Sequence, residues 1–308
     1  MTLQFTQKSR TNFAHQLLHY GFILLLLGRF WQYFFWDIPL REWLWSVDYA
    51  SPLMTWLCQC TWEEYLSSRS WDQGIQWAIK IQGIALACIA VLIGIPGVSN
   101  KIKTVASYIA FGILTILSLC LFKENFFRIG FLIELAAQWF IPLLYIYIVL
   151  GKNDKYRIVF LKIVLALTFI GHGLYAVGFY PIPGIFVDMI ISGFHVSEDT
   201  AIMLLNIAGY LDLIVALGLF IPGLYLLSVQ YMIVWGILTT FARVFTQVHF
   251  DGLFWDTFNQ WAFETLIRNV HFVLPITLWL YSFNSRVSFN QLKFSPNWKK
   301  LIYRFGLK

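Results

Sequence analysis

The sequence contains eight apolar runs, each close to the length that an α-helix needs to cross a membrane, about 20 residues. The hydrocarbon region holds no water to bond exposed peptide groups, so each run is expected to be helical whatever its local propensity. The sequence therefore predicts an all-α, polytopic membrane protein with eight transmembrane helices. The predicted spans are 17–36, 76–96, 104–122, 127–149, 159–180, 200–221, 224–245 and 261–283.

The composition agrees with this class. Hydrophobic residues make up 59% of the 308 residues, whereas Asp, Glu, Lys and Arg together make up 12%. Soluble proteins are about 25% charged, so this chain has too few charges to cover a water-exposed surface. That excludes a disordered chain and argues against a soluble enzyme. The net charge of +6 indicates membrane topology rather than affinity for nucleic acid, and no nucleic-acid partner is expected.

Charges between the predicted spans divide by sign. Connections on one side, together with both chain ends, hold thirteen basic residues and one acid, Asp154, whereas the opposite connections hold most of the acids. Because basic loops stay in the cytoplasm, both termini are predicted to be cytoplasmic in a multi-pass protein of the cell (inner or plasma) membrane. Two ends on one side also require an even number of spans. The basic residues are Lys8, Arg10, Lys101, Lys103, Lys152, Lys155, Arg157, Arg286, Lys293, Lys299, Lys300, Arg304 and Lys308.

Two long connections lie on the predicted outer side. Residues 37–75 hold five Trp and six acidic residues, and residues 179–199 are mostly apolar. Both are expected to contain helices that lie along the membrane surface. The segments 37–75 and 181–199 are the predicted docking sites for a protein partner. A third outer connection, 246–260, is expected to be an aromatic loop.

Cys58 and Cys60 form a C-x-C pair in the first of these connections. One interpretation is a pair of apolar residues at the membrane interface, because no further metal ligands accompany them. The other interpretation is a redox pair. The sequence leaves both open.

An internal repeat relates the two halves of the chain. Residues 81–97 resemble residues 207–223 at an offset of 126, and both end in Ile-Pro-Gly. Gly-Ile-Leu-Thr at 112–115 recurs at 236–239. Ordered matches at similar offsets predict two four-helix units. With four crossings each, both units have the same orientation, which favours a pocket at the interface of the halves. The predicted units are 1–150 and 151–308.

The second half carries a pattern that is similar to one family. A Gly-His-Gly motif at 171–173 stands in its first predicted helix, and a Gly-x-x-Asp motif at 209–212 stands in its second. This arrangement resembles the four-helix DoxX-like membrane protein family over most of the second half. The first half resembles a degenerate copy, with Arg29 at the His position and Leu86 at the acid position.

The resemblance implies a four-helix membrane unit and a redox context. Relatives in this family include membrane subunits linked to thiosulfate–quinone oxidoreductase and to other oxidative or thiol-handling complexes. The family supplies no well-defined catalytic motif to carry over. It usually has Glu where this chain has Asp212, and a basic residue shortly after the His-Gly pair. Here Leu174, Tyr175 and Ala176 stand at that place.

Ionisable side chains inside the predicted spans are costly, about 2.5–3.5 kcal/mol for Asp, Arg or Lys at a helix centre on insertion scales. They are expected to face the bundle interior or a wet cavity. Counting along each helix at about 1.5 Å per residue places all of them except Asp212 in the outer half of the bilayer. The predicted ligand-binding residues are Arg29, Glu134, His172, Asp212, Arg243, Glu264, Arg268 and His271.

Three of these residues share one helix face, because Glu264 and Arg268 are four apart and Arg268 and His271 are three apart. One interpretation is a structural ion pair that holds the last helix to its neighbours. The other is an outward-facing polar pocket for a head group, a quinone ring or a proton. Histidine suits hydrogen bonding to a quinone carbonyl and proton relay. No metal site is expected, since the one H-x-x-x-H pair, His15 and His19, lacks the Glu of H-E-x-x-H and an obvious third ligand.

Three functions stay open at this level. The first is an integral membrane subunit of a redox-linked assembly that binds a quinone or a lipid-like molecule. The second is a transporter or carrier with a site between the two repeats. The third is a non-catalytic membrane scaffold. No catalytic residue is assigned, and a quinone is the one cofactor that the sequence suggests.

Overall fold

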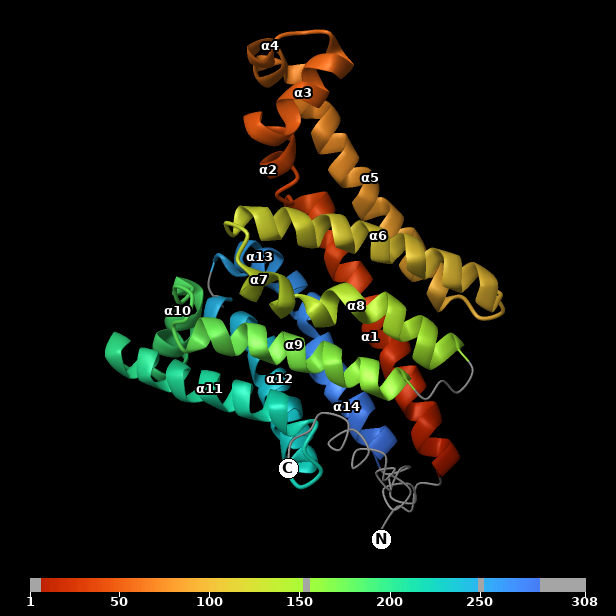
Figure 1. The fold of residues 1–308 in the computed structure, drawn as a ribbon, viewed down its shortest axis with the longest axis vertical. Coiled ribbons are helices and arrows are strands. Elements are labelled where there is room, and N and C mark those ends of the chain that lie inside the picture. The colour runs from red at the N-terminus through yellow and green to blue at the C-terminus, as the bar shows by residue number, and fades with distance from the viewer. Residues whose placement is uncertain (1–6, 152–155, 249–251, 283–308) are drawn as a thin grey trace, which may run out of the picture.

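A computed structural model describes residues 7–151, 156–248 and 252–282, and every regular element in these ranges is helical. Figure 1 shows long helices packed beside one another, with α2–α4 standing clear of the bundle at one end. The elements are α1 (Gln7–Phe35), α2 (Arg41–Leu44), α3 (Val47–Cys58), α4 (Trp62–Ser67), α5 (Arg69–Gly94), α6 (Asn100–Glu124), α7 (Ile129–Glu134), α8 (Ala136–Tyr145), the π-helix η1 (Ile146–Leu150), α9 (Arg157–Ala176), α10 (Gly184–Phe194), α11 (Glu198–Gly218), α12 (Tyr225–Gln247), α13 (Phe254–Arg268) and α14 (Val270–Ser282).

Six helical stretches are long and apolar enough to cross a membrane, namely α5, α6, α7 through η1, α9, α11 and α12. Large apolar side chains on their outer faces, such as Trp77, Val91 and Leu217, are more than half exposed. An apolar surface of this extent is unfavourable in water and favourable in lipid. The chain is therefore a multi-pass α-helical membrane protein. The predicted spans 17–36 and 261–283 fall on α1 and on α13 with α14, which are not among the six.

Glycines let the first two long helices of each half approach closely. Gly83 of α5 lies against α1, where an added Cβ would be 2.7 Å from the Cβ of Tyr33. Gly209 of α11 lies against the end of α9, where an added Cβ would be 2.8 Å from the Cβ of Ala176. Close backbone approach at small residues is typical of helix packing in membranes. The α1–α5 and α9–α11 pairs therefore use the same kind of contact at sequence-related positions.

Two other glycines bring the first helix of one half against the last helix of the other. Gly28 of α1 lies against α13, where an added Cβ would be 3.0 Å from the backbone nitrogen of Ile267. Gly171 of α9 lies against α7, where an added Cβ would be 2.5 Å from the backbone nitrogen of Glu134. Close glycine contacts thus join α1 to α13 and α9 to α7, so segments far apart in the sequence pack directly against each other.

The fourth helix of each half was predicted as one continuous span but is broken. Leu135 separates α7 from α8, and Asn269 separates α13 from α14. The second piece contains a proline in both cases, Pro142 and Pro275. Proline has no N–H, and its ring collides with the carbonyl four residues earlier. That carbonyl lies two or three residues after each break, so each proline removes a helix hydrogen bond from the turn that follows the interruption.

The connections differ in how well they match expectation. Short helices are present in both long outer connections, α2–α4 in the first and α10 in the second. The expected aromatic loop at 246–260 is wrong, because α12 continues to Gln247 and α13 already begins at Phe254. The aromatic residues that suggested a loop stack along the helix instead, with the rings of Phe254 and Phe258 5.6 Å apart.

Cys58 and Cys60 are joined by a disulfide at the end of α3, with Cα atoms 5.2 Å apart. Gln59 between them adopts a left-handed conformation, with φ of 51°, and Trp56 nearby is largely exposed. The structure thus holds the C-x-C pair in its oxidised form, in the part of the protein that stands clear of the bundle (Figure 1).

Candidate functional site

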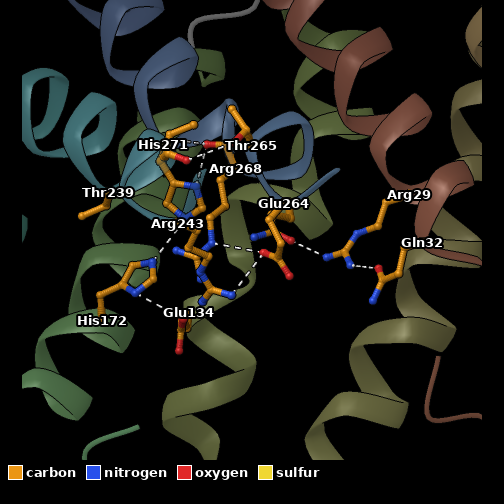
Figure 2. Close-up of polar contacts among 12 residues, drawn as sticks. Arg29, Gln32, Glu134, His172, Thr239, Arg243, Glu264, Thr265, Arg268 and His271 are labelled. Atoms are coloured by element: carbon orange, nitrogen blue, oxygen red, sulfur yellow. Dashed lines mark hydrogen bonds and ion pairs between the residues drawn. The ribbon is translucent and has the colours of Figure 1, made fainter. Parts of the chain in front are cut away.

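A buried polar cluster lies where the two halves meet (Figure 2). Its centre is Glu264 of α13. The Oε2 atom of Glu264 is 3.5 Å from Nη1 of Arg243 in α12 and 3.5 Å from Nε of Arg268, one turn further along α13. Two guanidinium groups thus share one carboxylate, and their combined charge exceeds that of their partner.

A second set of contacts links Glu134 of α7, His172 of α9 and His271 of α14 in series. Oε1 of Glu134 is 3.2 Å from Nδ1 of His172, whose Nε2 is 3.2 Å from Nε2 of His271. Nδ1 of His271 is 2.9 Å from the backbone oxygen of Arg268. That carbonyl lies at the end of α13 and also accepts the hydroxyl of Thr240 at 3.0 Å. The series therefore ends on an atom that can only accept hydrogen bonds.

Arg29 of α1 lies beside this cluster (Figure 2). Its Nη1 donates to Oε1 of Gln32 at 2.5 Å, and its Nη2 donates to Oε1 of Gln138 in α8. A buried charge needs hydrogen-bond partners, and neutral amides supply them here. Arg29 thus adds a positive charge at the interface, and the partners that hold it there are neutral.

Asp212 of α11 is buried apart from the cluster. Its Oδ1 accepts a hydrogen bond from the hydroxyl of Tyr231 in α12 at 3.0 Å. The same hydroxyl lies 3.4 Å from the carbonyl oxygen of Ala208. Asp212 therefore joins α11 to α12 by a hydrogen bond, one turn after the glycine that packs α11 on α9.

A cavity of about 300 Å³ lies against the cluster, enclosed by α9, α10, α11, α12 and the junction of α13 with α14. His172, Arg268 and His271 form its polar end, and Asp212 lies on its wall. The rest of the lining is mostly apolar. Its volume is in the range of small-molecule sites, about 300–1,000 Å³. All lining residues lie within 151–308, whereas the sequence favoured a pocket between the two halves.

The open edge of the cavity is apolar. Phe194 at the end of α10 and Phe245 of α12 line it, and they are 71% and 77% exposed. The side of the cavity formed by α10 also carries Phe186 and Met189, and no residue of α10 is fully buried. Surfaces of this kind favour hydrocarbon over water. The cavity therefore joins a lipid-compatible mouth to a polar end.

The structure describes all eight residues that the sequence singled out. Six of them form the cluster, Arg29 lies beside it, and Asp212 lies on the cavity wall. The six are Glu134, His172, Arg243, Glu264, Arg268 and His271.

Sequence reasoning missed the neutral polar partners of these groups. Gln32 and Gln138 lie within apolar runs, and a survey of all polar residues in the runs, rather than of ionisable ones, would have found them. Thr240 and Tyr231 would not have stood out. A threonine hydroxyl in a helix commonly bonds a carbonyl of its own helix, so Thr240 in a span indicates little, and nothing in the sequence near Tyr231 points to Asp212.

The described residues include no group of three His, Cys, Asp or Glu side chains placed to hold a metal ion. His172 and His271 instead contact each other nitrogen to nitrogen. A scan against protein-family models and searches of curated proteins and of solved structures found no match to this chain.

Proposed function

We propose that this protein is an integral membrane subunit of a redox-linked assembly and binds a quinone or a similar lipid-like molecule in the cavity. The lining of the cavity carries the proposal. Its closed end presents His172, Arg268 and His271, and most of its remaining wall is apolar. A quinone has carbonyl oxygens that accept hydrogen bonds, on a ring with an apolar chain. Donors at one end and an apolar path to the other fit both parts of such a molecule.

The mouth supports entry from the bilayer. Phe194 and Phe245 stand exposed at the cavity edge, where a water-soluble substrate would gain nothing by contact. A molecule already dissolved in lipid can pass between α10 and α12 with its chain trailing outward. Its polar head then reaches the histidines without crossing a charged surface.

The redox context rests on the DoxX-like pattern, and that pattern surrounds the cavity. His172 and Asp212 line the cavity, while Gly171 and Gly209 set the packing of α9 against α7 and α11. The oxidising or reducing centre would belong to a partner. The proposed docking surfaces are the outer segments 37–75, whose helices α2–α4 stand clear of the bundle (Figure 1), and 181–199.

We further propose eight membrane crossings in two four-helix repeats, with both termini in the cytoplasm. The 29-residue length of α1 supports a crossing, as does the end-to-end arrangement of α13 and α14. His15 in α1 bonds the hydroxyl of Tyr281 in α14 at 2.7 Å, which supports entry of the first helix and exit of the last on one side. The matched glycine contacts and the two broken fourth helices support the repeat.

The proposal is tested by quinone content and quinone binding. Protein extracted into native-lipid nanodiscs is expected to contain the quinone of its membrane, measured by mass spectrometry. After delipidation, decylubiquinone is expected to quench the fluorescence of Trp235, which lines the cavity. His172→Ala should weaken this binding about tenfold, equivalent to about 1.4 kcal/mol.

Two further variants make the test specific. His19→Ala removes a histidine that bonds Tyr145 far from the cavity, and it should leave binding unchanged. Ala208→Trp places a large side chain on the cavity wall and should abolish binding. Extracted protein without quinone, together with equal decylubiquinone quenching in the wild type and Ala208→Trp, would contradict the proposal.

A further inference from the structure

The series from Glu134 through His172 and His271 to the Arg268 carbonyl contains three contacts of 3.2, 3.2 and 2.9 Å. Each joins two atoms that carry lone pairs, so each needs one hydrogen between them. The carbonyl oxygen only accepts, so Nδ1 of His271 must carry its hydrogen. A carboxylate and two neutral imidazoles supply two hydrogens for three contacts. One more proton is required.

We propose that Glu134, His172 and His271 form a proton relay that holds one extra, mobile proton and can pass it to an oxygen acceptor in the cavity. The proton has three alternative places. On Glu134, the carboxylic acid donates to Nδ1 of His172. On His172 or on His271, that imidazole carries hydrogen on both nitrogens. Every arrangement keeps all three contacts hydrogen-bonded.

Movement along the relay is balanced at each step. When the proton leaves Glu134, an O–H bond breaks and an N–H bond forms at Nδ1 of His172. When it continues, the N–H bond at Nε2 of His172 breaks and a new one forms at Nε2 of His271. Electron pairs stay on the atoms that lose hydrogen, and no oxidation takes place. The relay therefore transfers only a proton, over two hydrogen bonds between three helices.

The cavity gives the relay an outlet, and this step rests on the proposed function. Both histidines line the cavity. A ligand oxygen can take the place of His271 as the acceptor of the Nε2–H bond of His172. The proton on Nε2 then passes to the ligand oxygen, and Glu134 donates its own proton to Nδ1 of His172. A negatively charged oxygen, such as that of a quinone reduced by a partner, is the chemical class of acceptor that fits.

Charges around the relay favour release. Arg243 and Arg268 lie within electrostatic range of Glu134, so the carboxylate left behind faces two guanidinium groups. Glu264 neutralises only part of their charge. The charged and titratable groups that surround the relay are Arg29 of α1, Tyr175 of α9, Asp212 of α11, Arg243 of α12, and Glu264 and Arg268 of α13.

The experiment combines two spectra of the full chain in nanodiscs near neutral pH. Nitrogen NMR of ¹⁵N-histidine protein counts protonated ring nitrogens, and infrared spectroscopy detects a buried carboxylic acid. We expect either a doubly protonated imidazole or an acid C=O stretch, and Glu134→Gln should remove whichever is present. The amide of Gln can still donate to His172, so the series stays connected without its extra proton. A carboxylate at Glu134 together with two singly protonated imidazoles at His172 and His271 would overturn the relay.

Glu63→Gln is the control, because it changes an exposed acid of α4, which stands clear of the bundle that holds the series (Figure 1). It should leave the histidine signals unchanged, and thermal unfolding verifies that each variant folds.

Decylubiquinone separates the two proposals. If it binds and shifts the His172 signals, the outlet is supported. If it binds without that shift, the outlet is overturned and the proposed function stands. If it does not bind, both the proposed function and the transfer of the proton to a cavity ligand are overturned. The presence of the extra proton is then tested by the NMR and infrared spectra alone.

Discussion

At the scale of single residues, the polar cluster combines unequal charges in a small buried space. Glu264 is the common partner of Arg243 and Arg268. Removing one partner of a buried ion pair leaves the other charge uncompensated, which is far more costly than replacing the pair with apolar groups. Glu264 should therefore matter more to stability than either of its two partners.

Glu264→Gln is expected to lower the free energy of unfolding by about 3–5 kcal/mol, the usual cost of breaking a buried pair. Thermal unfolding in detergent, followed by circular dichroism, measures the change. Glu63→Gln removes an exposed acid and should change stability by less than about 0.5 kcal/mol. Equal stability of the two variants would show that the ion pairs do not stabilise the packing of α12 against α13.

At the scale of elements, the contacts of α1 with α13 and of α9 with α7 depend on two glycines without room for a side chain. Gly171 is the tighter of them, because its added Cβ would be 2.5 Å from the backbone of α7 at Glu134, whereas that of Gly28 would be 3.0 Å from the backbone of α13 at Ile267. The backbone of α7 can yield only if the whole helix shifts. Because Glu134 begins the histidine series, such a shift would also lengthen the contact to His172.

Gly171→Ala is expected to destabilise the protein by about 1–3 kcal/mol, the usual cost of overpacking. Gly112→Ala is the matched control, because its added Cβ meets nothing within 4 Å on α6. This control should raise helix stability by about 0.5–1 kcal/mol. Thermal unfolding of both variants measures the difference, and opposite signs are the expected result.

The short helix α4 carries a pH-dependent cap. Glu64 accepts hydrogen bonds from the backbone nitrogen of Thr61 at 2.7 Å and from its hydroxyl at 3.0 Å. These bonds lower the pKa of Glu64 below its ordinary value of 4.5, and the bond from the backbone nitrogen has the larger effect. A lowered pKa means that the stabilisation is present above the unfolded-state value and is lost as the pH falls through the folded-state value.

Hydrogen exchange at the amide of Thr61 should therefore become less protected, relative to an unstructured peptide, as the pH falls below about 4.5, the Glu pKa in unfolded chains. Glu64→Gln should abolish this pH dependence, since an amide does not titrate in this range. A protection factor that stays constant with pH in the wild type would argue against the capping carboxylate.

At the scale of the whole molecule, orientation in the membrane follows from the alternation of helices and from the distribution of charge. The connection between α5 and α6 and that between α11 and α12 should lie in the cytoplasm. The α4–α5 region and α10 should lie outside. Four positions at these places tolerate a new side chain, either because an added Cβ meets nothing or because the side chain is already exposed. They are Gly74, Lys101, Gly184 and Gly223.

Single cysteines at these positions, in a Cys88→Ser background, are expected to separate into two groups. A membrane-impermeant maleimide should label Gly74→Cys and Gly184→Cys in intact cells. It should label Lys101→Cys and Gly223→Cys only after permeabilisation. Labelling of all four from outside, or the reverse pattern, would contradict the proposed orientation.

Sequence reasoning predicted the membrane class and the centres of the long helices, because lipid forces any long apolar run to be helical. It did not predict the breaks at Leu135 and Asn269, because no local signal marks them and neighbouring helices supply partners for the backbone groups that are released. For instance, the amide of Ala137 at the start of α8 donates to the hydroxyl of Thr168 in α9 at 2.9 Å.

The ionisable residues of the site could likewise be selected from the sequence, because charge in a span is costly wherever it lies. Their grouping could be predicted only within α13, where Glu264 and Arg268 are four residues apart and form an ion pair. The contacts between helices could not be predicted. Whether His172 meets Glu134 or Asp212 depends on which face of α9 turns toward α7, and this follows from the Gly171 contact. The cavity depends on α10, whose position over α12 no local pattern indicates.

The apolar edge between α10 and α12 has a thermodynamic consequence for any ligand that enters there. Such a molecule is drawn from a two-dimensional solution, and its occupancy depends on its mole fraction among the lipids rather than on its molarity in water. Diluting the protein with detergent lowers that fraction even when the total amounts stay constant. Affinities for this site are therefore comparable between preparations only at equal ligand-to-lipid ratios.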